Sequence, residues 1–165
     1  MEDNEMKKVY KLGIVAMLVL FAASCKTTQS YSYHTFETEC LGVELDGSQT
    51  LKAWGTGRNK KDAVEQAKKN AVRDVIFKGN FTGSKDCFEK PLLLEVNAQE
   101  KYANYFNTFF RDGGEFINYI SMEDERKHAR IADSRNKDQS KYSVVVRVKR
   151  EELKEKLIKD GILKP

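Results

Sequence analysis

A run of thirteen uncharged residues, 12–24, limits what this chain can fold into, because it marks the start of the sequence for removal. Three lysines between positions 7 and 11 precede the run, and the small residues Ala22, Ala23 and Ser24 end it directly before Cys25. This order of basic, apolar and small residues is typical of a secretory signal peptide. A helix of this length spans about 20 Å, too short for the roughly 30 Å core of a bilayer. Cleavage before Cys25 leaves 141 residues for folding.

Cys25 resembles the cysteine of the bacterial lipobox, because it follows small residues directly after the apolar run. In lipoproteins of that class, the cysteine is acylated and becomes the first residue of the mature chain. The resemblance implies that Cys25 carries a lipid that anchors the protein in the outer membrane. The alternative interpretation is an ordinary signal peptide followed by a chance cysteine. Met6, with basic residues directly after it, is the expected true start.

The sequence predicts three consecutive parts: a signal peptide (1–24), a lipidated leash (25–34) and a single domain (35–165). Residues 26–32 are polar and contain no aliphatic side chain, which is the composition of a flexible tether. In lipoproteins of the Bacteroides type, acidic residues directly after the cysteine direct the protein to the cell surface. Residues 26–29 contain none, so we expect the periplasmic face of the outer membrane.

The charge pattern is that of a solvated surface. The formal net charge is +4, and residues 1–24 carry three basic and three acidic side chains, so the mature chain keeps this value. Basic and acidic residues are interleaved, and no basic run exceeds three residues. A nucleic-acid groove needs a basic patch or stripe, so no nucleic-acid partner is expected.

Cys40 and Cys87 form a pair once Cys25 is assigned to the lipid. In an oxidising compartment, such an even remainder predicts a disulfide. The bond would close a loop of about 47 residues and stabilise the domain by about 3–4 kcal/mol. Two buried free thiols are the alternative. His34 and His128 do not stand at ligand spacing from these cysteines, so we expect no metal and no cofactor.

Alternating patterns and turn residues predict a β-hairpin at the start of the domain. Its strands cover residues 36–45 and 50–54, joined through Asp46-Gly47, a pair that tolerates positive φ. The second strand is expected to stop at residues 55–57, which read Gly-Thr-Gly.

A helix follows, with Asn59 as its N-cap, Asp62 at the N3 position and Gly79 at its end. One face has apolar residues at helical spacing: Ala63, Val64, Ala67, Ala71, Val72, Val75 and Ile76. The alanines let this helix lie close against a sheet. Charged residues of both signs run along the opposite face, which we expect to be solvated: Lys61, Glu65, Lys69 and Arg73.

The second half predicts further elements of both kinds. After a loop over residues 80–96, a helix begins at Asn97 and stops at 112–114, and a last helix covers 151–159. Strands are predicted at 116–122, 129–132 and 142–148. The fold class is therefore α+β: a two-layer domain in which an antiparallel or mixed sheet has about three helices packed on one face.

Two segments carry a resemblance to a known family. One is the strand end Trp54-Gly55-Thr56-Gly57 that leads into the alanine-rich helix, and the other is the terminal strand and helix, 142–162. Together they resemble a family of small α/β domains in outer-membrane lipoproteins, which includes the twenty-kilodalton Helicobacter lipoprotein and the amino-terminal domain of flagellar assembly protein T. The chain is also similar to Bacteroides lipoproteins with the same two cysteines. The resemblance implies an envelope protein without known catalytic residues.

The turn before the first helix is a candidate anion site. Gly55 and Gly57 precede the helix, and Arg58 and Lys60 stand next to its first backbone amides, which attract phosphate or carboxylate groups. The turn lacks the third glycine of a dinucleotide fingerprint and the Gly-Lys-Ser/Thr of a P-loop. A tight structural turn is the default interpretation.

The second helix is unusually aromatic, and most of its rings are expected in the core. Tyr105 and Phe110 lie at the margin of the buried sector, so we assign them to a candidate partner-binding patch.

Patterns that suggest an enzyme are weak. Neither histidine belongs to a nucleophilic motif, residues 123–125 (Glu-Asp-Glu) are interpreted as a solvated run, and Arg135 and Lys137 interrupt a possible calcium loop. We expect a non-catalytic interaction or scaffold module, bound to the membrane by its lipid and to an envelope protein partner. The alternative function is binding of a small ligand, anion or glycan.

Overall fold

A computed structural model describes residues 38–79, 82–87, 90–122, 130–132 and 140–164. The chain separates into two units, Met1–Ser32 and Tyr33–Pro165, and all described residues belong to the second. The predicted signal peptide, Cys25 and the leash lie outside the described residues, as do His34, His128 and the segments 123–129 and 133–139.

The domain begins with the predicted hairpin. Strands β1 (Glu39–Val43) and β2 (Gln49–Gly57) pair antiparallel, with Val43 opposite Gln49. At the turn, Gly47 has φ 79°, a conformation that glycine adopts without strain. The Asp46 carboxylate accepts a 2.9 Å hydrogen bond from the amide of Ser48, which explains why Asp-Gly forms this turn.

Strand β2 runs further than the sequence predicts. It continues through residues 55–57 and pairs with β6 (Ser140–Val148) along its whole length, from Gln49 opposite Val148 to Gly57 opposite Ser140. The expectation that the strand stops at Gly55 is wrong, because both glycines lie within the ladder, beneath a helix that leaves no room for a side chain.

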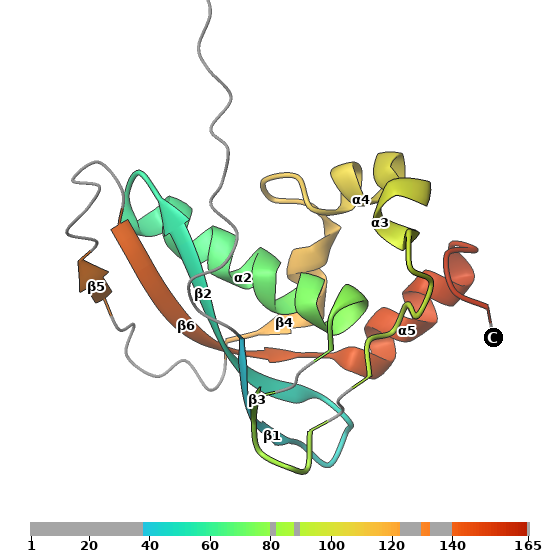
Figure 1. Ribbon diagram of the computed structural model, residues 1–165, viewed down its shortest axis with the longest axis horizontal. Helices are drawn as coiled ribbons and strands as arrows, with labels where there is room; N and C mark the ends of the chain where they lie inside the picture. The colour runs from blue at the N-terminus through green and yellow to red at the C-terminus, as the bar shows by residue number, and fades with distance from the viewer. Residues whose placement is uncertain (1–37, 80–81, 88–89, 123–129, 133–139, 165) are drawn as a thin grey trace, which may run out of the picture. The chain divides into compact units, whose positions relative to one another are not determined.

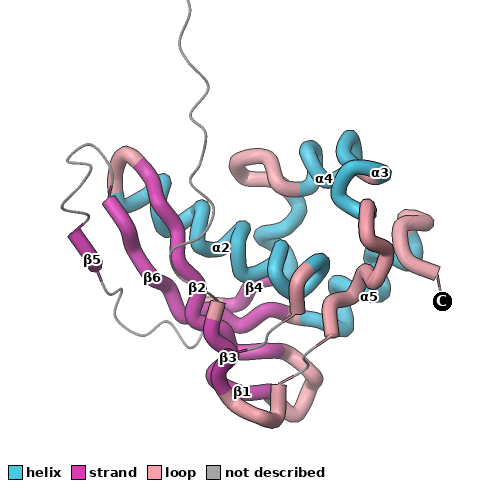
Figure 2. The backbone as a smooth tube through the Cα atoms, viewed as in Figure 1, coloured by secondary structure: helices cyan, strands magenta, loops and turns pink. Residues whose placement is uncertain are grey.

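The described strands form one mixed sheet in the order β3-β1-β2-β6-β4 (Figure 1). Strand β3 (Thr82–Gly83) runs parallel to β1, and the other pairs are antiparallel. Two short strands share the second edge of β6: β4 (Ile120–Ser121) at its C-terminal end and β5 (Arg130–Ala132) at its N-terminal end. The tube in Figure 2 shows the two long strands, β2 and β6, running side by side.

Helix α2 (Lys60–Phe77) packs across β2 and β6 and forms the second layer. As predicted, Asn59 is its N-cap: the side-chain oxygen accepts a 3.0 Å hydrogen bond from the amide of Asp62. The predicted apolar face is buried except for Val64, which is half-buried. Asp74 is also buried, and its carboxylate accepts a hydrogen bond from the hydroxyl of Thr38, at the entry to β1.

The predicted second helix is two helices, α3 (Ala98–Lys101) and α4 (Ala103–Phe109), which separate at Tyr102. Asn97 makes no side-chain capping bond, unlike Asn59. Residues 116–122, predicted as a strand, mostly form a 3₁₀ helix, η2 (Glu115–Tyr119). Phe116 is fully buried, Ile117 is 44% exposed and Tyr119 is half-buried, so the inward positions are three apart, as in a 3₁₀ helix.

Helix α5 (Arg150–Lys159) ends the domain and buries Leu153 and Leu157, as predicted. One hydrophobic core joins the inner face of the sheet, α2, the aromatic rings of α4 and η2, and α5. The fold is therefore α+β, as the sequence predicts, with helix α2 in extensive contact with the sheet. Helix α4 joins the core through α2, where the rings of Phe77 and Phe106 lie 4.7 Å apart.

Candidate functional site

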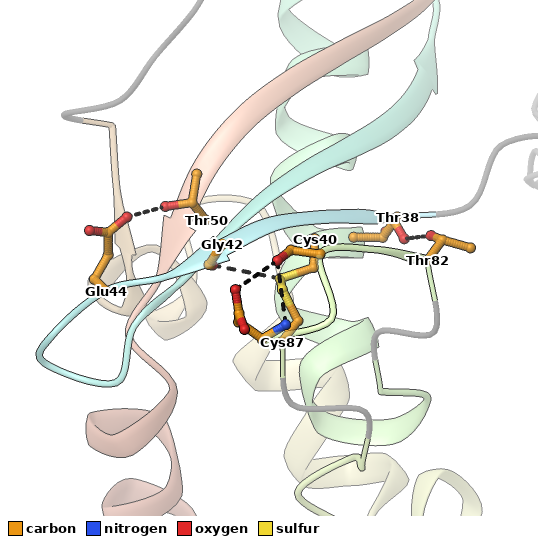
Figure 3. The surroundings of a disulfide bond; sticks show 9 residues. Thr38, Cys40, Gly42, Glu44, Thr50, Thr82 and Cys87 are labelled. Atoms are coloured by element: carbon orange, nitrogen blue, oxygen red, sulfur yellow. Dashed lines mark hydrogen bonds between the residues drawn. A yellow bond between two sulfur atoms is a disulfide. The ribbon is translucent and has the colours of Figure 1, made fainter.

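A disulfide joins Cys40 on β1 to Cys87 in the loop after α2, with a Cα–Cα distance of 6.3 Å (Figure 3). The predicted pair is confirmed, and the free-thiol alternative is wrong. Both cysteines are buried. The hydroxyl of Thr82 donates a 2.7 Å hydrogen bond to the carbonyl of Thr38, and the amide of Ser84 donates to the carbonyl of Cys40 at 2.8 Å. The loop is thus held against β1 both covalently and by its backbone.

The same loop satisfies the end of helix α2. The amides of Leu92 and Leu93 donate hydrogen bonds to the carbonyls of Val75 and Ile76, at 3.0 and 2.8 Å. The last carbonyls of a helix have no partner within it. Gly79, with φ 78°, donates its amide to the carbonyl of Asp74 at 2.7 Å, so a glycine turn and this loop cap the helix together. The side chains of Leu92 and Leu93 are buried.

The structure places the predicted anion-site residues in two different environments. Gly55 and Gly57 lie under the first turns of α2: a Cβ on Gly55 would overlap the carbonyl oxygen of Ala63, and one on Gly57 would come within 2.7 Å of the Asp62 side chain. Arg58 and Lys60 are exposed. The glycines therefore serve close packing of helix on strand.

The first turn of α2 already contains a negative group. The Asn59 side-chain nitrogen donates a 2.9 Å hydrogen bond to the Asp62 carboxylate, and the Asn59 side-chain oxygen accepts a 3.0 Å hydrogen bond from the Asp62 amide. A carboxylate at this position complements the positive end of the helix. The arrangement favours a structural role for this turn over anion binding.

Tyr105 and Phe110 do not form an exposed aromatic patch, which corrects the prediction. Phe110 is 7% exposed, and its ring stacks on Phe106 at a centroid distance of 6.0 Å. Tyr105 is half-buried, and its hydroxyl donates a 2.7 Å hydrogen bond to Asp160. The apolar pattern within α4 could not predict that both side chains are covered, because the cover comes from two other elements, α2 and the end of α5.

The charged face of α2, predicted to be solvated, instead holds the segment after α4. The Glu65 carboxylate accepts a 3.1 Å hydrogen bond from the amide of Gly113, and Lys69 forms an ion pair with Asp112. The Lys69 side chain is only 11% exposed, and its ammonium lies 5.7 Å from the ring centroid of Phe116. The hydrogen bond from Lys69 lowers the pKa of the Asp112 carboxyl below 3.8.

A second polar cluster ties α4, η2 and α5 together. The Lys156 ammonium lies 2.8 Å from the Glu115 carboxylate and 3.1 Å from that of Asp160, and these contacts raise the pKa of Lys156. Burial, and then donation to Asp160, raises the pKa of the Tyr105 hydroxyl well above 10. Burial of Asp160 opposes ionisation, but the hydrogen bonds from Tyr105 and Lys156 hold the pKa of Asp160 below 3.8.

A surface groove lies between the C-terminal half of α2 and the pair α3–α4. It consists of two adjoining hollows of about 350 and 320 Å³, which share Phe77 and Gln99. The first is lined by Arg73, Phe77, Gln99, Ala103, Phe106, Asn107 and Phe110. The second is lined by Phe77 and by residues 95–100. Aromatic rings form its floor, and its rim is polar.

Comparisons with known proteins identify no relative of this chain. No protein-family model matches it, and no curated protein or solved structure gives a significant match.

Several polar side chains along this groove make no hydrogen bond or ion pair with a described residue. Among the residues that the structure describes, the side chains of Gln99 and Asn107 make no hydrogen bond and Arg73 makes no ion pair. The Arg73 guanidinium carbon lies 5.0 Å from the ring centroid of Phe110, a cation–π arrangement. The sequence does not reveal these residues, because the charged row of α2 resembles a solvated face and no local pattern predicts the helix break at Tyr102.

The described ranges contain neither a metal-binding cluster nor a helix that could span a membrane. Within the described ranges, no group of three or more His, Cys, Asp or Glu side chains is placed to hold a metal ion. The helices in those ranges include none with the length and apolar character needed to cross a membrane. The predicted carboxylate run at 123–125 and the excluded calcium loop lie outside the described residues.

Proposed function

We propose that this chain is a non-catalytic lipoprotein, anchored through Cys25 on the periplasmic face of the outer membrane, that acts as an interaction or scaffold module in an envelope assembly. The groove between α2 and α3–α4 carries the proposal. Its rim offers two side-chain amides without hydrogen bonds and a guanidinium without an ion pair among the described residues.

An extracytoplasmic location is supported by two independent features. The Cys40–Cys87 disulfide belongs to the core of the domain, and such bonds form and persist in oxidising compartments. The signal-like segment before Cys25 and the polar leash after it agree with export and tethering. Together they favour an envelope protein.

Binding through a groove is favoured over binding through a raised aromatic patch. The rings of α4 are committed to the core, and partly exposed Phe77 lies on the groove floor. Interfaces usually combine an apolar centre with a polar rim, which is the composition of this groove. A partner that enters it would bury the ring edges and pair the amides at the same time.

The anchoring half of the proposal is tested by replacing Cys25 with Ser. We expect the wild-type protein to carry acyl mass and to fractionate with the outer membrane, and the variant to appear in the soluble periplasmic fraction. If the wild type lacks acyl mass and the variant stays membrane-bound, the lipoprotein proposal is wrong.

The interaction half is tested by chemical crosslinking and pull-down of the native lipoprotein from envelope membranes. One stoichiometric partner, recovered reproducibly, is the expected result. Recovery of the chain as a monomer whose thermal stability rises with phosphate or a glycan would contradict the scaffold role and favour the ligand-binding alternative.

A further inference from the structure

We propose that the groove between α2 and α3–α4 binds an extended peptide segment of a partner protein, with an acidic side chain of that segment on Arg73. This inference rests on the proposed interaction function and adds the site and the chemistry of the partner. Three observations carry it: the state of Arg73, the rim amides without hydrogen-bond partners among the described residues, and the distribution of charge along the groove.

Arg73 is a fixed cation whose charge is not neutralised within the described structure. Its guanidinium lies over the Phe110 ring at 5.0 Å, and it makes no ion pair there. Lys69, one turn earlier on the same helix, is already paired with Asp112. A guanidinium presents its donors in a rigid fork that matches the two oxygens of a carboxylate. Arg73 therefore selects for an acidic group.

The rim amides offer the groups that a peptide backbone binds. Gln99 on α3 and Asn107 on α4 are both exposed, and both line the first hollow. Each carboxamide offers a donor and an acceptor, the pair of groups that a peptide bond requires.

The centre of the groove has room for an apolar side chain. Ala103 lines the first hollow with a side chain of little bulk, and Phe77 and Phe106, whose rings lie 4.7 Å apart, line it as well. An aliphatic side chain of the partner would be buried against these rings at about 25 cal/mol per Å² of apolar surface. Two hollows that adjoin at Phe77 and Gln99 suit a peptide chain better than a compact ligand.

Charge gives the groove a direction. The end formed by Arg73 is basic, whereas the other end carries Glu95 and Glu100. Glu95 is paired with Lys101 at 2.8 Å, and Glu100 makes no ion pair with a described residue. A bound segment therefore carries its acidic residue toward Phe110 and none toward Glu100. A neutral glycan would leave Arg73 unmatched.

The test uses the mature lipoprotein in detergent micelles and a synthetic library of short random-sequence peptides. We expect the selected peptides to be enriched in Asp or Glu at one position, and the best of them to shift the side-chain NMR signals of Gln99 and Asn107. Arg73→Gln should weaken its binding about tenfold, the effect of losing one charge-assisted hydrogen-bond pair. Arg111→Gln, an equal charge change at an exposed residue outside the groove lining, should leave binding unchanged.

Three results would overturn the inference. They are selection without preference for acidic residues, signal shifts that map outside the groove, and equal binding by the Arg73→Gln variant. If a chito-oligosaccharide shifts the same signals in both proteins, the groove is a glycan site instead. If the Arg73→Gln variant binds the peptides as tightly as the wild type, and envelope crosslinking still recovers a partner, the proposed function stands and the peptide site is wrong. If the peptides bind as expected but crosslinking recovers no partner, the proposed interaction role in the envelope is wrong and the peptide site in the groove stands.

Discussion

The hydroxyl of Tyr105 on α4 donates a 2.7 Å hydrogen bond to the carboxylate of Asp160, the residue that ends α5. The two residues are 55 positions apart in the sequence, so the contact belongs to the tertiary structure. Lys156 approaches the same carboxylate from one turn earlier on α5. This group of contacts fixes the C-terminal helix to the aromatic layer, and it can be measured directly.

Tyr105→Phe should lower the free energy of unfolding by about 1 kcal/mol, because it removes a hydrogen bond to a charged acceptor at a partly exposed position. The ring and its packing against Phe106 and Phe109 are retained. Urea denaturation of the wild type and the variant measures the difference. A double-mutant cycle with Asp160→Asn isolates the pair. Strict additivity of the two single changes would show that the hydrogen bond does not contribute.

Acid should remove the contribution of Asp160. The hydrogen bonds from Tyr105 and Lys156 hold its pKa below the usual 3.8 despite burial, so the folded state binds a proton less readily than the unfolded state. The resulting stabilisation is full above the unfolded pKa and is lost as the pH falls through the folded pKa. The stability difference between wild type and Asp160→Asn should therefore shrink below about pH 4. A difference that stays constant from neutral pH down to about pH 2 would refute this assignment.

Gly55→Ala should destabilise the domain by about 3 kcal/mol or more, because the added methyl group overlaps the backbone of α2 at Ala63 and Ala67. Backbone atoms cannot rotate away as a side chain can, so the helix must move off the strand. Gly42→Ala is the matched control in the same sheet, since no atom lies within 4 Å of its added methyl group. We expect thermal unfolding to separate the two variants clearly. Equal melting temperatures would mean that the helix is not seated on Gly55.

Replacing Cys40 and Cys87 together with Ala should cost about 3–4 kcal/mol, the chain-entropy value for a loop of this size. The loss should be largest in the loop after α2, whose hydrogen bonds to Cys40 and to the last turn of α2 depend on its position. Amide hydrogen exchange at Leu92 and Leu93 reports on that loop, and denaturation reports on the whole domain. Unchanged exchange at both amides would show that the backbone holds the loop without the covalent bond.

The helix α2 and its cap were predictable because local chemistry determines them. Asn59 and Asp62 satisfy each other across three residues, and the apolar positions repeat at helical spacing, so the cues lie within one segment. The disulfide was predictable in a different way, from the number of cysteines and the expected compartment rather than from geometry. Both predictions are confirmed.

Predictions failed where contacts between distant segments override the local pattern. Gly55 looks like a strand end, but pairing with Tyr142 continues the ladder and the helix above requires the glycine. Phe116 and Ile120 suggest one strand, but only Ile120 lies in a strand (β4), and the core accepts Phe116 from a 3₁₀ turn. Local propensity is a weak guide when burial of a large ring is at stake.

The candidate site was the least predictable part. Arg73 belongs to a row of charged residues that resembles a solvated helix face, and its position beside Phe110 depends on how α4 lies on α2. Gln99, Ala103 and Asn107 have no distinctive motif. A groove is a property of two packed helices, so a pattern within either helix cannot reveal it.

The entry of the chain into the domain has a mechanical consequence. In the proposed lipoprotein, a pull on the tether would first reach the described structure at Thr38, where hydrogen bonds to Asp74 and Thr82 would bear the load. Two residues further on, the disulfide of Cys40 would transmit force directly to Cys87, without passing through the hairpin. The sheet and the loop that caps α2 would therefore share the force. Strand β1 could not separate from the sheet unless that loop moved with it.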